Sequence, residues 1–150
     1  MLEIRREPAG SPDARRLLEA MVAEMLEMYA MSEMPTAAGV DDLEPPAGGA
    51  FLVGREDGRP VAGGGLKRLE PGVAEIKRMY VTPDARGRGH ARRLLTALEN
   101  AARELGYERV RLDTGASQPH ARALYESAGF RPIDDYNDNP KAAYWGEKLL

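Results

Sequence analysis

Apolar residues recur at steps of three and four positions in three segments of the chain. Such a spacing gives one apolar face to a helix. Ser11 and Pro12 suit the N-cap and the first position of the first segment, whereas Gly106 and Gly129 suit the ends of the second and third. The pattern therefore predicts three amphipathic helices, over residues 12–29, 91–105 and 119–128.

Shorter apolar stretches predict strands, over residues 2–6, 51–55, 61–69, 74–82, 109–114, 130–133 and 143–149. Asp57-Gly58 and Pro71-Gly72 are turn signals, which make the second, third and fourth strands a meander. Three successive glycines, Gly63 to Gly65, weaken the third strand and indicate a bulge or a close approach to its backbone. The Pro- and Gly-rich segment 34–49 predicts a loop with one short helix.

Strands and helices alternate only in the second half of the chain. A strand, a helix and a loop come first, then three strands, and then helix, strand, helix and two strands. A connection through a helix joins parallel strands, whereas a tight turn joins antiparallel ones. The sequence therefore predicts an α/β protein of the α+β type, with a mixed sheet.

Composition limits the class of protein and of site. The chain has 150 residues, 43% hydrophobic and 30% charged, which is typical of a single globular domain, here residues 1–150. The lack of cysteine excludes disulfides, thiolate zinc sites and cysteine nucleophiles, and two histidines are too few for a multi-histidine metal centre. A carboxylate metal site stays open, but we expect no metal.

Charge and hydropathy argue against nucleic-acid and membrane partners. The net charge of −3 disfavours a general binder of polyanions. The first residues carry acids and arginines, and no segment approaches the roughly 18 apolar residues of a membrane span. We therefore expect no signal peptide, no membrane partner and a cytoplasmic location.

A basic, glycine-rich segment separates the strand 74–82 from the second helix. Between Glu75 and Arg93 lie six basic and two acidic residues, and positions 86–91 read RGRGHA. Free N–H groups at a helix N-terminus bind anions, and glycines let a ligand approach the backbone. The turn predicts a pyrophosphate site, although an RNA-binding Arg-Gly fragment or an ordinary exposed turn has the same local pattern. Neither the Walker nor the full Rossmann glycine motif is present.

Two motifs resemble those of the GNAT superfamily of N-acetyltransferases, which use acetyl-coenzyme A. The first, (Gln/Arg)-x-x-Gly-x-(Gly/Ala), is matched by Arg86, Gly89 and Ala91. The second, Asn-x-x-Ala-x-x-Leu-Tyr-x-x-x-Gly-Phe, is matched by Ala121, Leu124, Tyr125, Gly129 and Phe130. Gln118 stands where Asn is usual, which affects one polar contact to the cofactor or to the tyrosine. With the matching order of elements, the resemblance covers nearly the whole chain.

The resemblance implies the acyl-CoA N-acyltransferase fold, a mixed, mostly antiparallel sheet of six to seven strands with helices on both faces and with strands four and five splayed. Acetyl-coenzyme A would be the cosubstrate. The backbone amides of residues 86–92 would hold its pyrophosphate, and the pantetheine arm would pair with the backbone of Met79 and Val81. The residues implied to bind the cofactor are Met79, Tyr80, Val81, Arg86, Gly87, Arg88, Gly89, His90, Ala91, Arg92, Gln118 and Arg122.

The resemblance also implies two catalytic residues, Glu75 and Tyr125. An acceptor amine is mostly protonated at neutral pH, so a base must take its proton, directly or through water. Glu75 has the family's position for that base; alternatively, it is a surface strand residue paired with Lys77 or an arginine. Tyr125 has the position of the acid that protonates the departing thiolate; alternatively, it is a core residue. Without cysteine, the amine attacks directly in a ternary complex.

The acceptor is expected to be a primary amine on a small molecule. Segments 34–49 and 134–139 would border its pocket, and Asp134, Asp135 and Asp138 would suit a cation. A solvated acidic loop and a calcium site without EF-hand spacing are the alternatives for these acids.

Other classes of function remain open at this point. The acceptor could be a peptide or protein amine, the chain could be a non-catalytic acyl-CoA sensor, or the Arg-Gly turn could belong to an RNA-binding or scaffold domain. A homodimer is implied by the resemblance alone. His90 and His120 are expected at the surface or as helix caps, and Trp145, with Tyr144, in the core or a dimer interface. The methionines of the first helix are expected in the core or at the rim of a groove.

Overall fold

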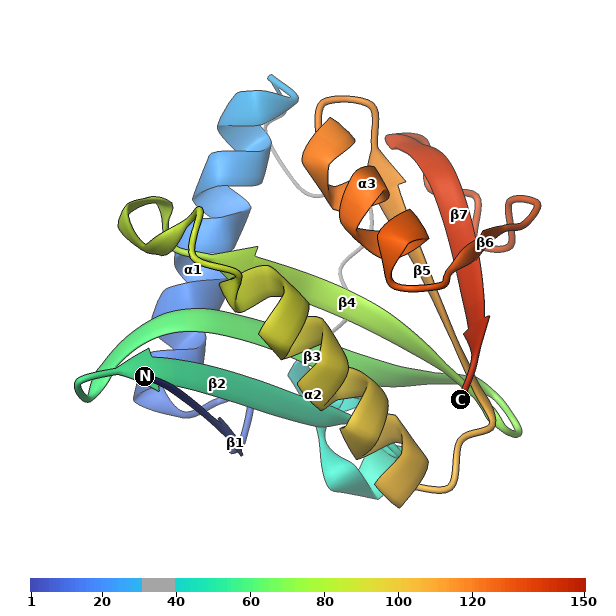
Figure 1. The fold of residues 1–150 in the computed structure, drawn as a ribbon. Helices are drawn as coiled ribbons and strands as arrows, with labels where there is room; N and C mark the ends of the chain where they lie inside the picture. Colours follow the sequence, from blue (N-terminus) through green and yellow to red (C-terminus); the bar gives the residue numbers. More distant parts are fainter. Residues whose placement is uncertain (31–39) are drawn as a thin grey trace.

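The computed structural model describes residues 1–30 and 40–150 of the chain, and within them the predicted elements follow one another in the predicted order (Figure 1). The strands are β1 (Leu2–Arg6), β2 (Ala50–Glu56), β3 (Arg59–Glu70), β4 (Val73–Val81), β5 (Arg109–Gly115), β6 (Arg131–Pro132) and β7 (Ala142–Leu149). The helices are α1 (Pro12–Met28), α2 (His90–Glu104) and α3 (Pro119–Ser127), with short 3-10 helices η1 (Val40–Leu43), η2 (Pro45–Ala47) and η3 (Pro83–Ala85).

The seven strands form one sheet in the order β1-β2-β3-β4-β5-β7-β6. Neighbouring strands are antiparallel except β4 and β5, which are parallel because α2 connects them. The pairing of β4 with β5 is limited to residues 73–75 and 109–111, and beyond that point the two strands separate. The mixed sheet and the splayed pair of strands are therefore confirmed.

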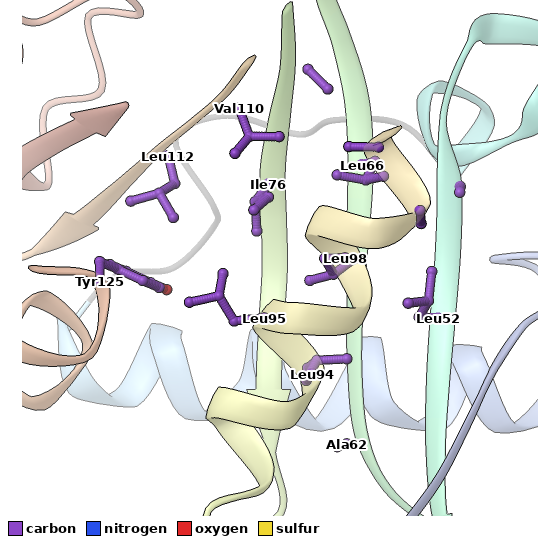
Figure 2. Close-up of a cluster of buried hydrophobic side chains, with 14 of the residues drawn as sticks. Leu52, Ala62, Leu66, Ile76, Leu94, Leu95, Leu98, Val110, Leu112 and Tyr125 are labelled. Carbon is purple, nitrogen blue, oxygen red and sulfur yellow. The ribbon is translucent and has the colours of Figure 1, made fainter. Parts of the chain in front are cut away.

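Helices cover both faces of the sheet, as predicted. Leu94, Leu95 and Leu98 of α2 are buried against one face, together with Tyr125 of α3 (Figure 2). On the opposite face, Leu17 of α1 packs with residues of β2 and η1 in a second cluster. Full burial of one such leucine contributes about 1.5–3 kcal/mol, so these contacts fix the helices on the sheet.

The glycines of β3 allow a close approach to its backbone, as predicted, but the bulge lies in the neighbouring strand β4. A Cβ on Gly64 would stand 3.0 Å from Leu98 Cδ1 and 3.2 Å from Met79 Cγ, so glycine lets α2 lie close to the sheet. Gly63 pairs with Tyr80 and Gly65 with Lys77, which leaves one residue of β3 opposite two of β4. The extra residue is accommodated at Arg78, whose φ of +62° is unusual for a side-chain-bearing residue.

The ends of α1 follow from local chemistry. The Ser11 hydroxyl accepts a hydrogen bond from the Ala14 N–H at 3.2 Å, and Pro12 occupies the first turn. Ala30, with φ of +51°, ends the helix. Of the segment 34–49, residues 34–39 lie outside the described residues; the remainder contains two short 3-10 helices where one helix was expected. In the described ranges, none of the helices is long and apolar enough to cross a membrane.

Candidate active site

A cavity of about 700 Å³ lies where β4 and β5 separate. Its walls come from the second half of α1, from β4, from the turn that leads into α2, from the end of β5 and from the start of α3. Met21, Met25 and Met28 of α1 line it, so the methionine face borders a groove while Met21 is also part of the core. Flexible thioether side chains adapt well to an irregular ligand.

One end of the cavity is the glycine-rich turn before α2. Gly87 and Gly89 have φ values of +81° and +80°, and Gly89 is the N-cap of the helix without any side-chain cap. The Arg86 amide donates to the Pro83 carbonyl, but among the described residues the amides of residues 87–92 donate to no protein acceptor. The turn therefore presents a row of free N–H groups at the positive end of α2, which suits a phosphate-bearing ligand.

The arginines of this turn are held by protein partners. Arg86 forms an ion pair with Glu24 of α1 at 2.7 Å, donates to the Val81 carbonyl at 2.9 Å and lies over the Tyr80 ring. The Arg86 guanidinium keeps the pKa of the Glu24 carboxyl below its usual value. Arg88 pairs with Glu56 at 2.8 Å. The guanidinium groups thus hold the turn in place, while its backbone faces the cavity.

Arg92 and Arg122, which were expected to bind the cofactor, are not among the residues that line the cavity. Arg92 donates to the Ser127 hydroxyl, which connects α2 to α3. Arg122 pairs with Glu126 at 3.1 Å and lies over the Tyr144 ring, 5.0 Å from its centroid. Both arginines are exposed, so a ligand can reach them by exchanging these contacts.

The other end of the cavity contains the carboxylate of Glu75. Glu75 is only 3% exposed, so the alternative of a surface residue is wrong. The ion pair that this alternative included is present, with Lys77 Nζ 3.2 Å from the Glu75 carboxylate. The Tyr136 hydroxyl donates to Glu75 at 2.6 Å and the Asn137 amide at 3.3 Å. Burial, and after it the charge of Glu75, raise the pKa of Tyr136, so this phenol stays a donor to the carboxylate.

Asn137 connects two carboxylates in the cavity wall. Its amide nitrogen donates both to Glu75 of β4 and to Asp113 of β5, and Asn139 donates to Asp113 at 3.4 Å. The side-chain oxygen of Asn137, Oδ1, accepts a hydrogen bond from the Trp145 indole N–H at 2.9 Å. Trp145 therefore fixes the orientation of the amide, and the amide fixes both acids.

Tyr125 lies between the two ends. Its side chain belongs to the buried cluster (Figure 2), and its ring packs beside Phe130. Its hydroxyl lies 3.8 Å from the Met79 sulfur, and both residues line the cavity. Burial raises the pKa of the Tyr125 phenol, with the charge of Asp113 acting in the same direction. The phenol is therefore protonated at neutral pH and can act as a proton donor. Tyr125 is both a core residue and a site residue.

Gln118 has a partner that its motif does not reveal. Its Oε1 accepts a hydrogen bond from the Tyr29 hydroxyl at 3.2 Å, and the Gly115 amide lies 3.4 Å from the same oxygen. The contact joins the end of α1 to the turn between β5 and α3. Gln118 and Tyr29 both line the cavity.

Several expectations for the remaining residues need correction. His90 is buried rather than at the surface, because it begins α2 with its ring turned inward, 3.1 Å from Glu56; His120 is exposed. Asp134, Asp135 and Asp138 are exposed, and Asp135 accepts two backbone N–H groups of its own turn. The solvated acidic loop is therefore correct for these acids. Of segment 134–139, Asn139 lines the cavity. The Tyr136 phenol and the Asn137 amide instead donate to the carboxylates of Glu75 and Asp113, and such polar, uncharged side chains carried little signal in the sequence. Trp145 is half-buried, with Tyr144 in the core.

The part of the chain that the structure describes contains no cluster of His, Cys, Asp or Glu side chains that could hold a metal ion. The chemistry available in the cavity is that of three carboxylates, of which Glu24 is paired with Arg86, a buried phenol and a row of backbone amides. These groups can bind an anion at one end and move protons at the other.

Comparison with known proteins agrees with this geometry. The uncharacterised N-acetyltransferase YjgM of Escherichia coli is 40% identical over 90 residues, which cover 58% of this chain and 54% of that protein. The match thus spans about half the length of that relative. A crystal structure from Klebsiella pneumoniae, described as an acyl-CoA N-acyltransferase, aligns with this structure at a TM-score of 0.80 and 29% sequence identity. The alignment covers 100% of this chain and 98% of that one.

A third protein extends the likeness in fold. A GNAT acetyltransferase of Elizabethkingia anophelis, solved with acetyl-CoA bound, has a TM-score of 0.72 at 18% identity, over 99% of this chain and 98% of that one. A sequence model described as the acetyltransferase (GNAT) family matches residues 14–130, which include the glycine-rich turn and α3. Because this match covers most of the chain, the protein belongs to the GNAT family of acetyltransferases.

Proposed function

We propose that this protein transfers an acetyl group from acetyl-coenzyme A to a primary amine on a small molecule. The proposal depends on one observation. A single cavity of about 700 Å³ is lined by the free amides of the glycine-rich turn, by the buried Glu75 carboxylate and by Tyr125. Its volume lies within the range of roughly 300–1,000 Å³ that small-molecule sites occupy.

The cavity fits the parts of the cosubstrate. The amides of residues 87–92 suit the pyrophosphate, and β4 beyond Glu75 has no strand beside it on the β5 side, so that its backbone can pair with an extended arm. The E. anophelis protein of the same fold binds acetyl-CoA, which supports this assignment. The cosubstrate supplies an acyl thioester at the point where the two strands separate.

The residues of the cavity divide the proton transfers between them. Glu75 takes a proton from the acceptor ammonium, directly or through water, which frees the nitrogen lone pair to attack the thioester carbonyl. The backbone N–H of Met79 or Val81 stabilises the negative charge that develops on the carbonyl oxygen. Tyr125 donates its proton to the departing sulfur. The acylated nitrogen gives its second proton back to Tyr125, so that a neutral amide and free coenzyme A leave, and Glu75 releases the first proton to solvent.

The first test is Tyr125→Phe, followed by the release of free thiol from acetyl-coenzyme A with a panel of small amines and amine-bearing peptides. We expect turnover to fall roughly 10²–10⁴-fold, because a positioned acid contributes that much. Binding of coenzyme A, at 100 times its Kd, should still stabilise the variant by about 2.7 kcal/mol, a shift of about 5–11 °C. Tyr107→Phe is the matched control, because its hydroxyl donates to the Gly48 carbonyl and lies outside the cavity lining.

Three results would change the proposal. Unchanged turnover in Tyr125→Phe would remove this residue as the acid. Stabilisation by coenzyme A without turnover of any amine would identify an acyl-CoA sensor. Turnover of peptide amines alone would move the acceptor from small molecules to proteins.

A further inference from the structure

Three charged side chains that line the cavity have no ionic partner in the described ranges: Asp113 and Arg78, which are half-buried and opposite in charge, and the exposed Lys141. Glu75 pairs with Lys77, and Glu24 pairs with Arg86. Asp113 accepts hydrogen bonds only from the side-chain amides of Asn137 and Asn139.

Arg78 is the second of these charges. Within residues 1–30 and 40–150, no carboxylate lies within 4.0 Å of its guanidinium and no hydrogen bond to its side chain is found. The side chain is half-buried, and burial lowers the pKa of the guanidinium, which nevertheless stays charged at neutral pH. A charge held in this way costs free energy until an anion pairs with it.

The backbone at Arg78 supports a functional role for this position. Its φ of +62° occurs inside a strand, at the bulge opposite Gly64, where glycine would carry no strain. A side-chain-bearing residue in this conformation costs about 1–3 kcal/mol and is found mainly where its placement serves a site. The bulge inserts Arg78 directly after Lys77, so that both line the cavity.

The surroundings of Arg78 favour its use at this end of the cavity. It also lines a smaller cavity of about 420 Å³, together with Leu18, Val22 and Leu26 of α1 and with the exposed Glu19, whose carboxylate is more than 4.0 Å from the guanidinium. Apolar side chains therefore lie beside the arginine, and they lower the local dielectric in which its charge acts. Lys141, which also lines the main cavity, is exposed and therefore screened by water.

We infer that the acceptor carries an anionic group in addition to its amine, and that Arg78 binds this group while Glu75 and Asp113 face the ammonium. The inference depends on the proposed acetyl transfer and specifies its substrate class. A guanidinium binds a carboxylate or a phosphate through two parallel hydrogen bonds, which gives both affinity and orientation. An acceptor with both charges would compensate the two half-buried unpaired charges of the cavity, Arg78 and Asp113, at once.

The test compares acceptors in matched pairs with the full chain and acetyl-coenzyme A. Glycine, β-alanine, 4-aminobutyrate and 6-aminohexanoate are each measured against their amides, and O-phosphoethanolamine against ethanolamine. For the best pair we expect kcat/KM to be about tenfold or more higher for the anionic member, the equivalent of one charge-assisted contact. The chain length of that pair reports the spacing between Arg78 and the reacting amine, and the phosphate pair separates phosphate from carboxylate.

Variants assign the effect to Arg78. In Arg78→Gln the ratio within the best pair should fall to about one, whereas Arg78→Lys should keep part of it because the charge remains. The ratio is the readout, so a loss of stability that affects both members cancels. Lys141→Gln should reduce the ratio by less than about twofold, because its charge is exposed. Arg103→Gln, on the exposed side of α2, should change neither member.

Protection of the protein against heat by each acceptor, with coenzyme A present, separates this inference from the proposed function. Selective protection by anionic amines that Arg78→Gln abolishes, without any turnover, would support the anion site and overturn acetyl transfer. Turnover with equal rates for anionic and neutral amines would overturn the anion site alone. The inference is also overturned if Lys141→Gln removes the preference, if Arg78→Gln weakens coenzyme A and leaves the ratio intact, or if no anionic amine reacts or protects.

Discussion

The two ends of the cavity are built in different ways. The end proposed to bind the cofactor is one continuous segment, 86–92, whose backbone conformation is set by two glycines and by the start of a helix. The acceptor end is assembled from β4, β5 and the segment between β6 and β7, so that Glu75 meets Asn137 across 62 positions of sequence. The first end therefore depends on local conformation, and the second depends on the whole sheet being correct.

This difference predicts how the two ends respond to substitution. At the cofactor end, a side chain of the wrong size matters more than a lost charge, because the backbone binds. At the acceptor end, single polar groups matter most, because each carboxylate is held by a few defined donors.

Glu75→Gln should have the largest effect. The substitution keeps the size of the side chain but removes the base, so we expect kcat/KM to fall about 10²–10⁴-fold. The shift in melting temperature that coenzyme A causes should be retained, since the other end of the cavity is untouched. Thiol release and thermal unfolding measure the two quantities. Glu108→Gln, at an exposed position, is the matched control, and equal losses in both variants would argue against a base at position 75.

Gly89→Ala should act on the opposite end. Gly89 and Gly58 have nearly the same φ, +80° and +79°, and both face open space, so alanine costs each position a similar free energy of folding. Only Gly89 lies in the cavity, where a methyl group would stand between the ligand and the amides. We expect the Kd for coenzyme A to rise about tenfold, or about 1.4 kcal/mol, in Gly89→Ala.

Isothermal titration of the two glycine variants provides the comparison. Gly58→Ala should bind coenzyme A as the natural chain does, although its melting temperature falls. Equal affinities in the two variants would show that the backbone of the turn does not hold the ligand.

Trp145→Phe should have a smaller effect, and on kcat rather than on coenzyme A. The variant keeps an aromatic ring but removes the indole N–H that orients Asn137. One hydrogen bond contributes about 0.5–1.5 kcal/mol, so a decrease in kcat of roughly two- to tenfold is expected. Asn137→Ala removes the donor to both carboxylates and should cost more than Trp145→Phe. If Trp145→Phe instead has the larger effect, the tryptophan acts through packing and not through the amide.

The same contrast explains how far the sequence alone could predict the molecule. Strands, helices and the turn were predictable because apolar periodicity, Ser11, Pro12 and the glycines act within a few residues. The strand that contains Glu75 followed from the apolar pattern, and the expected role of Glu75 as a base followed from the family resemblance. Its partners did not, since Tyr136 and Asn137 lie in a loop whose most visible feature is its acids.

Two residues show why the rest needed the fold. An acidic residue such as Asp135 suggests a cation site, yet its carboxylate accepts hydrogen bonds from two backbone N–H groups of its own turn. The sequence alone does not distinguish these two roles of an aspartate. Arg78 belongs to a basic run that suggested phosphate binding. The bulge, which comes from the register with β3, places it beside Lys77 at the acceptor end instead.

Removal of the ion pair between Glu24 and Arg86 should have the smallest effect, a decrease in the free energy of unfolding that depends on pH. Arg86 lowers the pKa of Glu24 in the folded protein below its usual value of 4.5, so the contribution of this carboxylate to stability is present above pH 4.5 and is lost as pH falls through the folded pKa. Both side chains are partly exposed, which limits the pair to about 0.5 kcal/mol at pH 7. Urea unfolding of Glu24→Gln should therefore differ from the natural chain by about that free energy at pH 7 and converge with it as the pH falls below the folded pKa of Glu24. A difference that persists in acid would show that Glu24 stabilises α1 through packing, and that the charge of this residue does not connect the helix to the cofactor end.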